Sequence, residues 1–478
     1  MERETANMTG VKRGRNVAEG TGSDGFSKRI ADLLAKQERR LEQETPKSRE
    51  MFERAIKTMP KGVGSTYQAR DPYPMYYTHG KGSKVYSVDG GEVSDFHNGY
   101  GCMVQGHAHP AIVEAVKRRV ELGTQFALPT EDQFVVAEHL AKNFKLPKWR
   151  FTNSGSESTM DAIRIARGLT GRDTIMKIFG SYHGHHDYAM ISIGFIQFDE
   201  RGPRDNYRSI PWGAGIPRTV VDLVYTVPFN DASVLEARIE RLEAEGHKPA
   251  CLIMEPIMFN LGMVPPEPGY LEAVRKITKQ HDIVLIFDEV KSGICIAAGG
   301  AVERYGVVPD MVCLAKALGA GLPSGAIGGT DEVMAVVNDG TVYQVGTYSG
   351  NPLCMAAARA SLEEVMTPDA YKHLDYLNDR LCTELTAVAA KHDFPGYTDG
   401  MRAKGWFNFA TGRVVDYESF MEYQNPSLCA LAWLYNINNG VLISPGRAEE
   451  WTLSVQHTDE DIDRYVAAFT ELVEDVTA

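Results

Sequence analysis

The chain has 478 residues, of which 43% are apolar and 24% are charged, a composition typical of folded globular proteins. Lysine and arginine total 50, aspartate and glutamate total 63, and the net charge at neutral pH is −13. An acidic chain without a basic block is a poor partner for the phosphates of nucleic acids and for anionic membranes. We therefore expect neither nucleic-acid nor membrane partners.

Targeting signals and disulfides are not indicated either. No apolar run approaches the roughly 18 residues of a membrane span. Residues 1–27 are polar and lack the apolar stretch of a secretory signal. The seven cysteines are odd in number and scattered through apolar segments, as buried reduced thiols are. A cytoplasmic enzyme is the expectation.

The N-terminal part of the chain reads as three pieces. Residues 1–25 show no periodicity and predict a disordered tail, or an arm that a partner subunit orders. From Phe26 to Met59 apolar residues recur at helical spacing. Val85 to Phe96 alternates around Asp89-Gly90-Gly91, which predicts a β-hairpin. We assign residues 26–98 to an N-terminal segment of helix and short strands.

Residues 99–370 have a different sequence pattern, in which short apolar strands alternate with amphipathic helices. The strands are expected at residues 149–152, 174–179, 251–255, 283–288 and 311–314. Near-continuous apolar strands separated by helices predict an α/β domain with a mostly parallel sheet and helices on both faces. Residues 371–478 open with a helix, continue with short strands around Phe407 and Val441, and close with a helix capped by Thr458. They predict a small α+β unit.

Polar residues that follow the predicted strands are the candidates for chemistry, because open α/β sheets bind ligands at the carboxyl ends of their strands. Asn153–Glu157 open a helix, where free N–H groups hold a phosphate; a purely conformational role for this turn is the alternative. Asp288 would hold a buried cation, such as a metal or a protonated ring nitrogen, or would cap a helix. Lys316, flanked by apolar residues, would be a desolvated nucleophile or a solvent-facing helix residue.

In combination these residues favour one site. Asp288 and Lys316 are 28 residues apart, about one βα unit, so both would line one crevice. A lysine that forms a Schiff base, an acid for a pyridinium nitrogen and a phosphate-binding turn are the parts that pyridoxal phosphate requires. Tyr182 offers an aromatic ring to stack on that cofactor.

Five motifs, in this order, resemble the signature of class III aminotransferases, which belong to the fold-type I pyridoxal phosphate superfamily. They are Asn153-Ser-Gly-Ser-Glu157, Ser181-Tyr-His-Gly184, Phe287-Asp-Glu-Val290, Leu314-Ala-Lys-Ala317 and Gly346-Thr-Tyr-Ser-Gly-Asn-Pro352. Within the family the chain is most similar to the glutamate-1-semialdehyde 2,1-aminomutase branch. The stretches that indicate this branch are Lys61–Ser65, Gly106–Pro110 and Asp161–Arg167. The resemblance implies a large cofactor-binding α/β domain and a small α+β domain made from both ends of the chain.

The resemblance also implies roles for single residues. Lys316 would bind the cofactor covalently and move protons, and Asp288 would pair with the pyridinium nitrogen. Tyr182 and Val290 would enclose the ring on its two faces, and Asn260 would lie near its phenolic oxygen.

The phosphate would be bound by residues of two subunits. Gly155 and Ser156 would hold it through the backbone and a hydroxyl, and Thr347 would reach the phosphate of the neighbouring subunit. The resemblance therefore implies a homodimer with shared active sites. Glu255 would orient its neighbours at the end of its strand.

The chain departs from the aminomutase pattern where the substrate carboxylate is held. Ser65 is kept, but Gln68 stands at the arginine position and Arg70 lies two residues further on. A neutral amide in place of a bidentate cation should lose most of the selection for an anionic substrate. Glu449 corresponds to a glutamate of the family, and Arg447 is either a relocated carboxylate clamp or a solvated loop residue.

A second departure follows Asp288. Lys291-Ser-Gly-Ile-Cys-Ile296 stands where the family usually has an aromatic residue and an arginine after the glycine, which suggests a more apolar active-site entrance.

Two other patterns are set aside. Gly319–Gly325 resembles a dinucleotide-binding turn, but its spacing is wrong. His183, His185 and His186 have no carboxylate or thiol at ligand spacing, so no metal site is expected.

The leading functional hypothesis is a pyridoxal phosphate-dependent aminotransferase. It would move an amino group from an amine or amino acid, including β-amino acids, to a keto acid, aldehyde or ketone by a ping-pong mechanism. The alternative is a glutamate-1-semialdehyde aminomutase or a close intramolecular relative.

Overall fold

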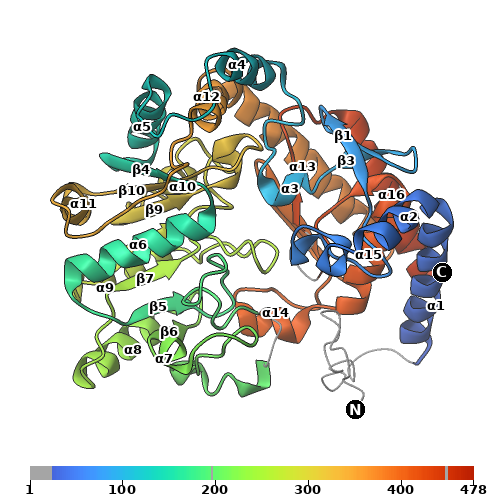
Figure 1. Ribbon diagram of the computed structural model, residues 1–478. Coiled ribbons are helices and arrows are strands. Elements are labelled where there is room, and N and C mark those ends of the chain that lie inside the picture. Colours follow the sequence, from blue (N-terminus) through green and yellow to red (C-terminus); the bar gives the residue numbers. More distant parts are fainter. Residues whose placement is uncertain (1–23, 195–197, 447–449) are drawn as a thin grey trace.

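A seven-stranded sheet organises the computed structural model, which describes residues 24–194, 198–446 and 450–478 (Figure 1). Its strands are β4 (Lys148–Thr152), β5 (Ile175–Ile178), β6 (Val224–Val227), β7 (Cys251–Met254), β8 (Val284–Asp288), β9 (Met311–Leu314) and β10 (Gly325–Gly329). They lie in the order β4-β10-β9-β8-β7-β5-β6. The pairs from β9 to β6 are parallel, and β10 lies antiparallel to both of its neighbours. The predicted mostly parallel sheet is confirmed.

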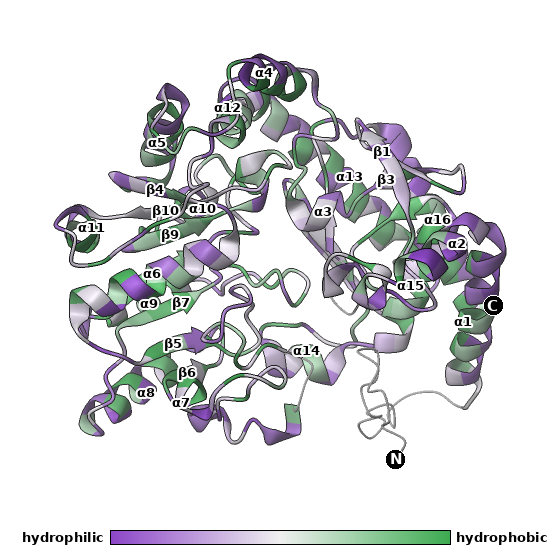
Figure 2. Ribbon diagram, in the orientation of Figure 1, coloured by the Kyte–Doolittle hydropathy of each residue, from purple (hydrophilic) through white to green (hydrophobic). Residues whose placement is uncertain are grey.

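Helices cover both faces of this sheet because its strands are apolar on both faces. Ile253 and Ile286 share a buried cluster with apolar residues of the helices α6 (Gly155–Thr170) and α11 (Asp331–Asn338). Their strand neighbours Leu252 and Phe287 point the other way, into a cluster with the helices α5 (Glu131–Phe144), α8 (Ala232–Ala244) and α9 (Tyr270–Gln280). In Figure 2 the helices that cover the sheet carry both hydrophobic residues (green) and hydrophilic residues (purple).

The two ends of the chain together form the rest of the molecule. One sheet has the order β1 (Tyr77–Lys81), β2 (Lys84–Ser87), β3 (Glu92–Asp95) and β13 (Val441–Leu442), and β13 pairs in parallel with β3. A second sheet contains β11 (Tyr397–Met401), β12 (Lys404–Asn408) and β14 (Glu450–Thr452). Helix α1 (Asp24–Glu44) packs on α15 (Pro426–Asn438) and α16 (Asp459–Thr477). A small domain made from both ends is therefore confirmed, while the residue boundaries of the domains stay predictions.

The remaining helices connect these layers. They are α3 (Asn98–Gly101), α4 (Pro110–Glu121), α7 (Arg218–Val221), α10 (Gly300–Tyr305), α12 (Pro352–Ala360), α13 (Pro368–Lys391) and α14 (Tyr417–Tyr423). Helix α16 begins directly after Thr458, as predicted. In the described part of the chain, no helix is long and apolar enough to span a membrane.

The N-terminal helix is two helices, so the prediction of one helix from Phe26 to Met59 is wrong. Helix α1 ends at Glu44, and α2 (Pro46–Ala55) starts with a proline, which has no N–H to continue the first helix. Asp89 of the predicted hairpin turn, which is confirmed between β2 and β3, accepts hydrogen bonds from the backbone N–H of Lys47 (2.7 Å) and the hydroxyl of Ser48 (2.6 Å). The break therefore docks the start of α2 on the hairpin.

Candidate active site

Lys316 lies directly beyond the carboxyl end of β9, the strand next to β8 in the sheet. Its backbone φ is +44°, in the left-handed region that residues other than glycine rarely adopt. Such residues cluster at functional sites. Burial, and after it the ammonium of Lys291, lower the pKa of Lys316 below the value of an ordinary lysine. A lysine that loses its proton readily is suited to act as a nucleophile and as a base.

Asp288 ends β8 and is buried, with both carboxylate oxygens engaged. Its Oδ2 lies 2.7 Å from Nδ1 of His183, and its Oδ1 accepts the N–H of Val290 at 3.0 Å. The position at a strand end is the predicted one, and the helix-capping alternative is wrong, because the next helix, α10, begins only at Gly300. Asp288 is thus a fixed, buried carboxylate beside the reactive lysine.

Glu255, directly after the neighbouring strand β7, organises residues that follow β7 and β5. Its Oε1 accepts the N–H of Tyr182 (3.2 Å) and the side-chain amide of Asn260 (2.8 Å), and its Oε2 accepts the N–H of Phe259 (3.0 Å). Burial raises the pKa of this carboxyl. Glu255 therefore orients Tyr182 and Asn260, the role expected for it.

The N-terminus of α6 supplies a place for an anion. Ser154 caps this helix by accepting the N–H of Glu157 (3.2 Å), and the first free N–H groups belong to Gly155 and Ser156. A Cβ on Gly184, whose φ is +99°, would lie 2.6 Å from Oγ of Ser156, so a glycine is required there. The loop that carries Tyr182 consequently lies against the start of α6.

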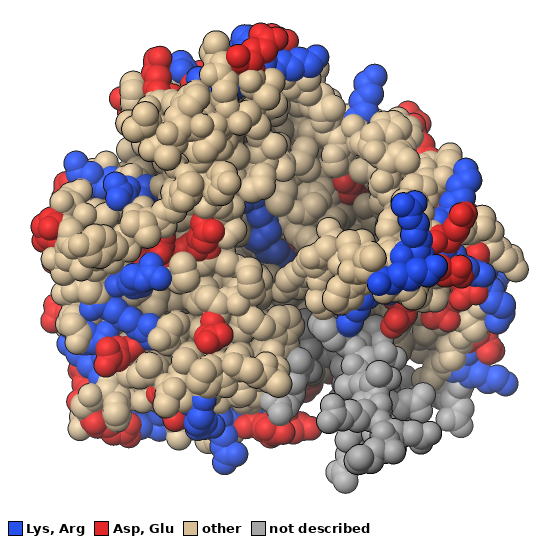
Figure 3. Space-filling view, in the orientation of Figure 1, with Lys and Arg blue, Asp and Glu red and all other residues tan. Residues whose placement is uncertain are grey.

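Three further contacts join these pieces into one site. Ser158 of α6 donates to the carbonyl of Leu314 at the end of β9 (3.1 Å), and Thr159 donates to the carbonyl of His183 (2.5 Å). A Cβ on Gly155 would lie 3.0 Å from the methyl groups of Val290. All the residues predicted for the cofactor except Thr347 thus meet at one edge of the sheet, and Figure 3 shows a hollow at the centre of the molecule with basic atoms on its floor.

These groups have the chemistry that pyridoxal phosphate needs. They comprise a lysine amine of lowered pKa, a buried carboxylate, an oriented aromatic ring, an amide and a helix N-terminus with a hydroxyl. Lys316 would hold the cofactor covalently, Asp288 would face its ring nitrogen and α6 its phosphate. The bound cofactor supplies an electron sink for carbanions.

Comparison with known proteins identifies the family. The model of the aminotransferase class-III family matches residues 66–416, well over half of the chain. The chain belongs to the class III aminotransferases. Like them it uses pyridoxal phosphate and has the fold-type I architecture, as its sequence predicts.

Individual relatives of this class III enzyme carry two different names. It is 38% identical over 427 residues to the glutamate-1-semialdehyde 2,1-aminomutase 2 of Brevibacillus brevis, covering 88% of this chain and 97% of that protein. The structure of an omega-transaminase from Sphaerobacter thermophilus matches with a TM-score of 0.85 and 32% identity, over 90% of this chain and 98% of that one. A glutamate-1-semialdehyde aminomutase from Pseudomonas aeruginosa, in complex with PMP, matches with a TM-score of 0.85 and 27% identity, over 94% and 99%. The sequence relatives favour the aminomutase alternative over the leading hypothesis.

Some predicted site residues are not joined to this group. Ser65 and Gln68 are exposed, and Oε1 of Gln68 accepts the backbone N–H groups of Gly64 (3.1 Å) and Ser65 (3.2 Å). Thr347 is also exposed, and its carbonyl accepts a hydrogen bond from Gln125 (2.7 Å). Arg447 and Glu449 lie outside the described residues.

The second departure from the family pattern was misread. Ile294, Cys295 and Ile296 are each no more than 1% exposed, so they belong to the core and do not make an apolar entrance. Lys291, the first residue of that stretch, is the one with an accessible side chain.

Sequence reasoning also missed two partners of the cofactor residues. His183 was considered only as a metal ligand, whereas it pairs with Asp288. Tyr67 was not singled out, and its ring lies edge-on to that of Tyr182 at 5.9 Å. The neighbouring His185 contacts Ser156 instead (2.9 Å). Alternation of polar and aromatic residues after a strand is too common a signal to show such pairings.

Proposed function

We propose that this enzyme is an intermolecular aminotransferase, which takes an amino group from an amine or amino acid and gives it to a keto acid, aldehyde or ketone. The observation that carries the proposal is the state of Gln68. At the position where the aminomutase pattern has a carboxylate-binding arginine, this side chain is a neutral amide. Its oxygen accepts hydrogen bonds from backbone N–H groups of its own loop. The tight hold that an intramolecular rearrangement needs is therefore lost at this position.

The chain's own residues suit proton transfer at a substrate carbon. Lys316 is the base, because burial lowers its pKa and so favours the neutral amine. His183 fixes Asp288, which keeps the carboxylate in place opposite the ring nitrogen. Tyr182, held through its backbone by Glu255, forms one wall of the site. The two half-reactions would use the same lysine in opposite directions.

The test is a single-turnover absorbance experiment with the cofactor-loaded enzyme, candidate amine donors and no acceptor. An aminotransferase loses the absorbance band of the lysine-bound cofactor and releases one equivalent of carbonyl product. If donors leave the spectrum unchanged while glutamate-1-semialdehyde becomes 5-aminolevulinate, the proposal is wrong.

The aminomutase is the second candidate, and the name of the Brevibacillus brevis relative favours it. It would require another group to hold the substrate carboxylate. Isomerisation of glutamate-1-semialdehyde without exchange of the amino group with added donors would establish it.

A homodimer with shared sites is part of the proposal. Thr347 lies in an exposed loop whose apolar residues Tyr343, Val345 and Tyr348 are 76%, 78% and 61% exposed. A contiguous apolar surface of this kind is typical of a subunit interface. Sedimentation equilibrium should give twice the mass of the chain, and Val345→Asp together with Tyr348→Asp should shift the enzyme to monomers with weakened cofactor binding. A monomeric wild-type enzyme would contradict this part. The cytoplasmic location stays a prediction.

A further inference from the structure

A cluster of three charged side chains, Lys291, Lys404 and Glu450, lies beside the cofactor residues and has no part in holding them. The carboxylate of Glu450 lies 2.7 Å from Nζ of Lys291 and 3.6 Å from Nζ of Lys404. Lys404 also donates to Thr452 at 2.8 Å, and Lys291 donates to the carbonyl of Phe259 at 2.9 Å. The cluster brings together β12, β14 and the loop after β8.

The cluster carries more positive than negative charge in a buried place. The side chains of Lys404 and Glu450 are 0% and 1% exposed. Within the cluster, two ammonium groups face one carboxylate. The charge of Lys291 also acts on Glu255, whose pKa is raised by burial, which favours the uncharged carboxyl. Burial raises the pKa of Cys295 to about 11 and lowers the pKa of His97 to about 4, so both are uncharged at neutral pH. A buried surplus charge is costly unless a counter-ion joins it.

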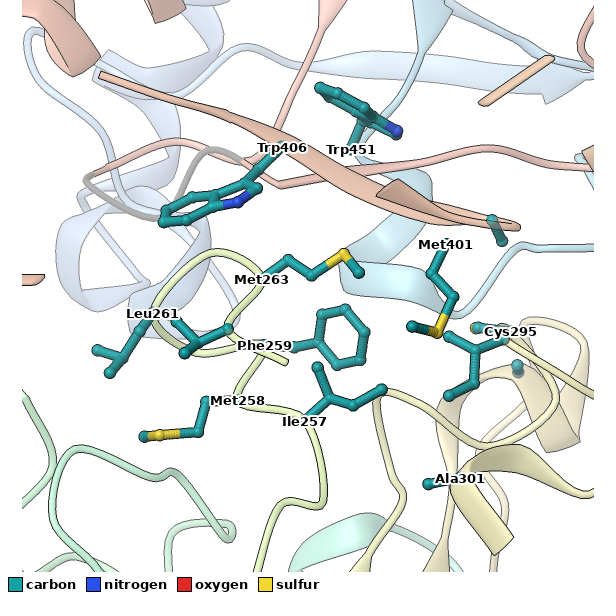
Figure 4. Packing of buried hydrophobic residues seen from close by; sticks show 14 of the residues in the cluster. Ile257, Met258, Phe259, Leu261, Met263, Cys295, Ala301, Met401, Trp406 and Trp451 are labelled. Carbon is teal, nitrogen blue, oxygen red and sulfur yellow. The ribbon is translucent and has the colours of Figure 1, made fainter. Parts of the chain in front are cut away.

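Apolar packing closes the cluster on its other sides. Figure 4 shows Phe259, Met263, Met401 and Cys295 gathered in the core beside β12. The ring of Phe259 lies 5.7 Å from Nζ of Lys404, and a Cβ on Gly101 would lie 2.7 Å from the same atom. Lys404 is thus enclosed, and an incoming molecule meets the cluster at another residue.

Lys291 is that residue, because its side chain is 14% exposed. The Phe259 carbonyl takes one of its three N–H donors and Glu450 faces a second, which leaves one without a partner among the described residues. Lys291 lies three residues after Asp288 and donates to the carbonyl of Phe259, the residue before Asn260, so it lies among the cofactor residues. After burial, its charge is the largest influence that lowers the pKa of Lys316. An accessible ammonium with a spare donor therefore stands next to the reacting lysine.

We propose that Lys291 binds the carboxylate of the substrate, both for the aminotransferase proposed above and for its aminomutase alternative, and so replaces the arginine that is missing at Gln68. Glu450 and the Phe259 carbonyl hold the ammonium in position, and Lys404 balances Glu450 so that Lys291 remains available to the substrate. The substrates of at least one half-reaction are then amino acids or keto acids and not simple amines.

Arg70 is the competing cation. Its guanidinium donates to the neighbouring Ala69 carbonyl at 2.9 Å, and burial, partly offset by Tyr100, lowers its pKa. Among the charges that act on the pKa of Lys316, that of Lys291 has the largest effect. The structure therefore favours Lys291, and the experiment compares the two.

The experiment measures carboxylate binding without turnover. Propionate is titrated into the cofactor-loaded enzyme, with propionamide as the neutral control, at constant ionic strength. The readout is the pKa of the nitrogen that links Lys316 to the cofactor, which is obtained from the visible absorbance measured as a function of pH. A carboxylate bound at Lys291 favours the protonated form, so saturating propionate should raise this pKa by about half a unit or more. Propionamide should leave it unchanged.

Four variants locate the response. Lys291→Met, which keeps the length and removes the charge, should weaken the propionate response at least tenfold, while Lys291→Arg should retain it. Arg70→Met and Gln68→Ala should respond like the wild type. A wild-type enzyme that does not respond to propionate, or a response lost in Arg70→Met and kept in Lys291→Met, would overturn the proposal. If Lys291→Met folds poorly, loss of the response in Arg70→Met would by itself overturn the proposal.

The titration also separates this proposal from the proposed function. It needs the cofactor on Lys316 but no amine transfer, so an aminotransferase and an aminomutase give the same readout. A positive propionate response in an enzyme that fails the donor test would leave Lys291 assigned and the aminotransferase reaction rejected.

Discussion

The two walls of the active site are built in different ways. The cofactor wall consists of Asp288, Glu255, Tyr182 and the start of α6, which follow strands of one sheet and are held by short hydrogen bonds. The substrate wall that we propose combines the exposed 65–70 loop with the partly exposed Lys291, which is supported by two buried residues of the small domain, Lys404 and Glu450. The sheet holds the cofactor residues in fixed positions. The residues that we propose to recognise the substrate lie in loops and in the small domain, where they can differ between members of the family. This division explains how enzymes of one family carry different names.

The largest effect should follow removal of the reactive amine. Lys316→Ala should lower turnover by about four orders of magnitude or more, because both the covalent attachment and the proton transfer depend on it. Visible absorbance should show cofactor bound without the lysine-linked band. Substantial turnover in this variant would mean that the cofactor wall is misassigned.

A close approach in the cofactor wall provides the second prediction. Gly184→Ala would place a methyl group 2.6 Å from Oγ and 2.7 Å from Cα of Ser156, at a φ of +99°. The start of α6 should shift, and cofactor affinity should fall about tenfold or more, measured by equilibrium dialysis.

Gly171→Ala is the matched control. This glycine also has a positive φ, +68°, but no atom lies within 4 Å of an added Cβ. It should cost about 1 kcal/mol of stability and leave cofactor affinity unchanged. Equal losses of affinity in the two variants would show that backbone strain, and not contact with Ser156, is responsible.

A buried lysine behind the cofactor wall gives a pH dependence. Nζ of Lys177 donates to the carbonyls of Ser181 (2.7 Å) and Ile191 (2.6 Å), and burial lowers its pKa to about 7. The unfolded chain has a lysine pKa of about 10.4. Between these values the native state binds fewer protons than the unfolded state, so the stability contributed by Lys177 rises with pH.

The comparison with Lys177→Met tests this sign. From pH 7 to pH 9 the wild type should gain about 2 kcal/mol of stability relative to the variant. The measurement is the melting temperature of both proteins across this range. Parallel curves would show that Lys177 keeps an ordinary pKa in the folded enzyme.

The smallest effect is expected in the substrate wall. Gln68→Ala removes two hydrogen bonds from an exposed loop and should change stability by no more than about 1 kcal/mol. The Michaelis constants of carboxylate substrates should change by less than about threefold, because the charge that we assign to binding lies elsewhere. A tenfold increase in these Michaelis constants would show instead that position 68 takes part in binding the substrate carboxylate.

Local sequence determined the cofactor wall and the sheet that carries it. The apolar strands can be predicted from their composition. Because these strands are parallel, their carboxyl ends lie at one edge of the sheet. The positions of Asp288, Lys316 and Glu255 therefore followed from the strands alone. The break at Pro46 was equally local and was overlooked, because the apolar spacing on both sides of it remains helical.

Only the tertiary structure decided which charges meet. Lys291, Lys404 and Glu450 are distant in sequence and look ordinary in their own segments, yet folding places them together in the core. The pairing of His183 with Asp288 is of the same kind. Strand and helix patterns depend on neighbours in the chain, whereas ion pairs across a core depend on how whole segments pack. The sequence by itself thus determined the family and the cofactor, and the packing of distant segments decided which charged side chains lie beside the cofactor residues.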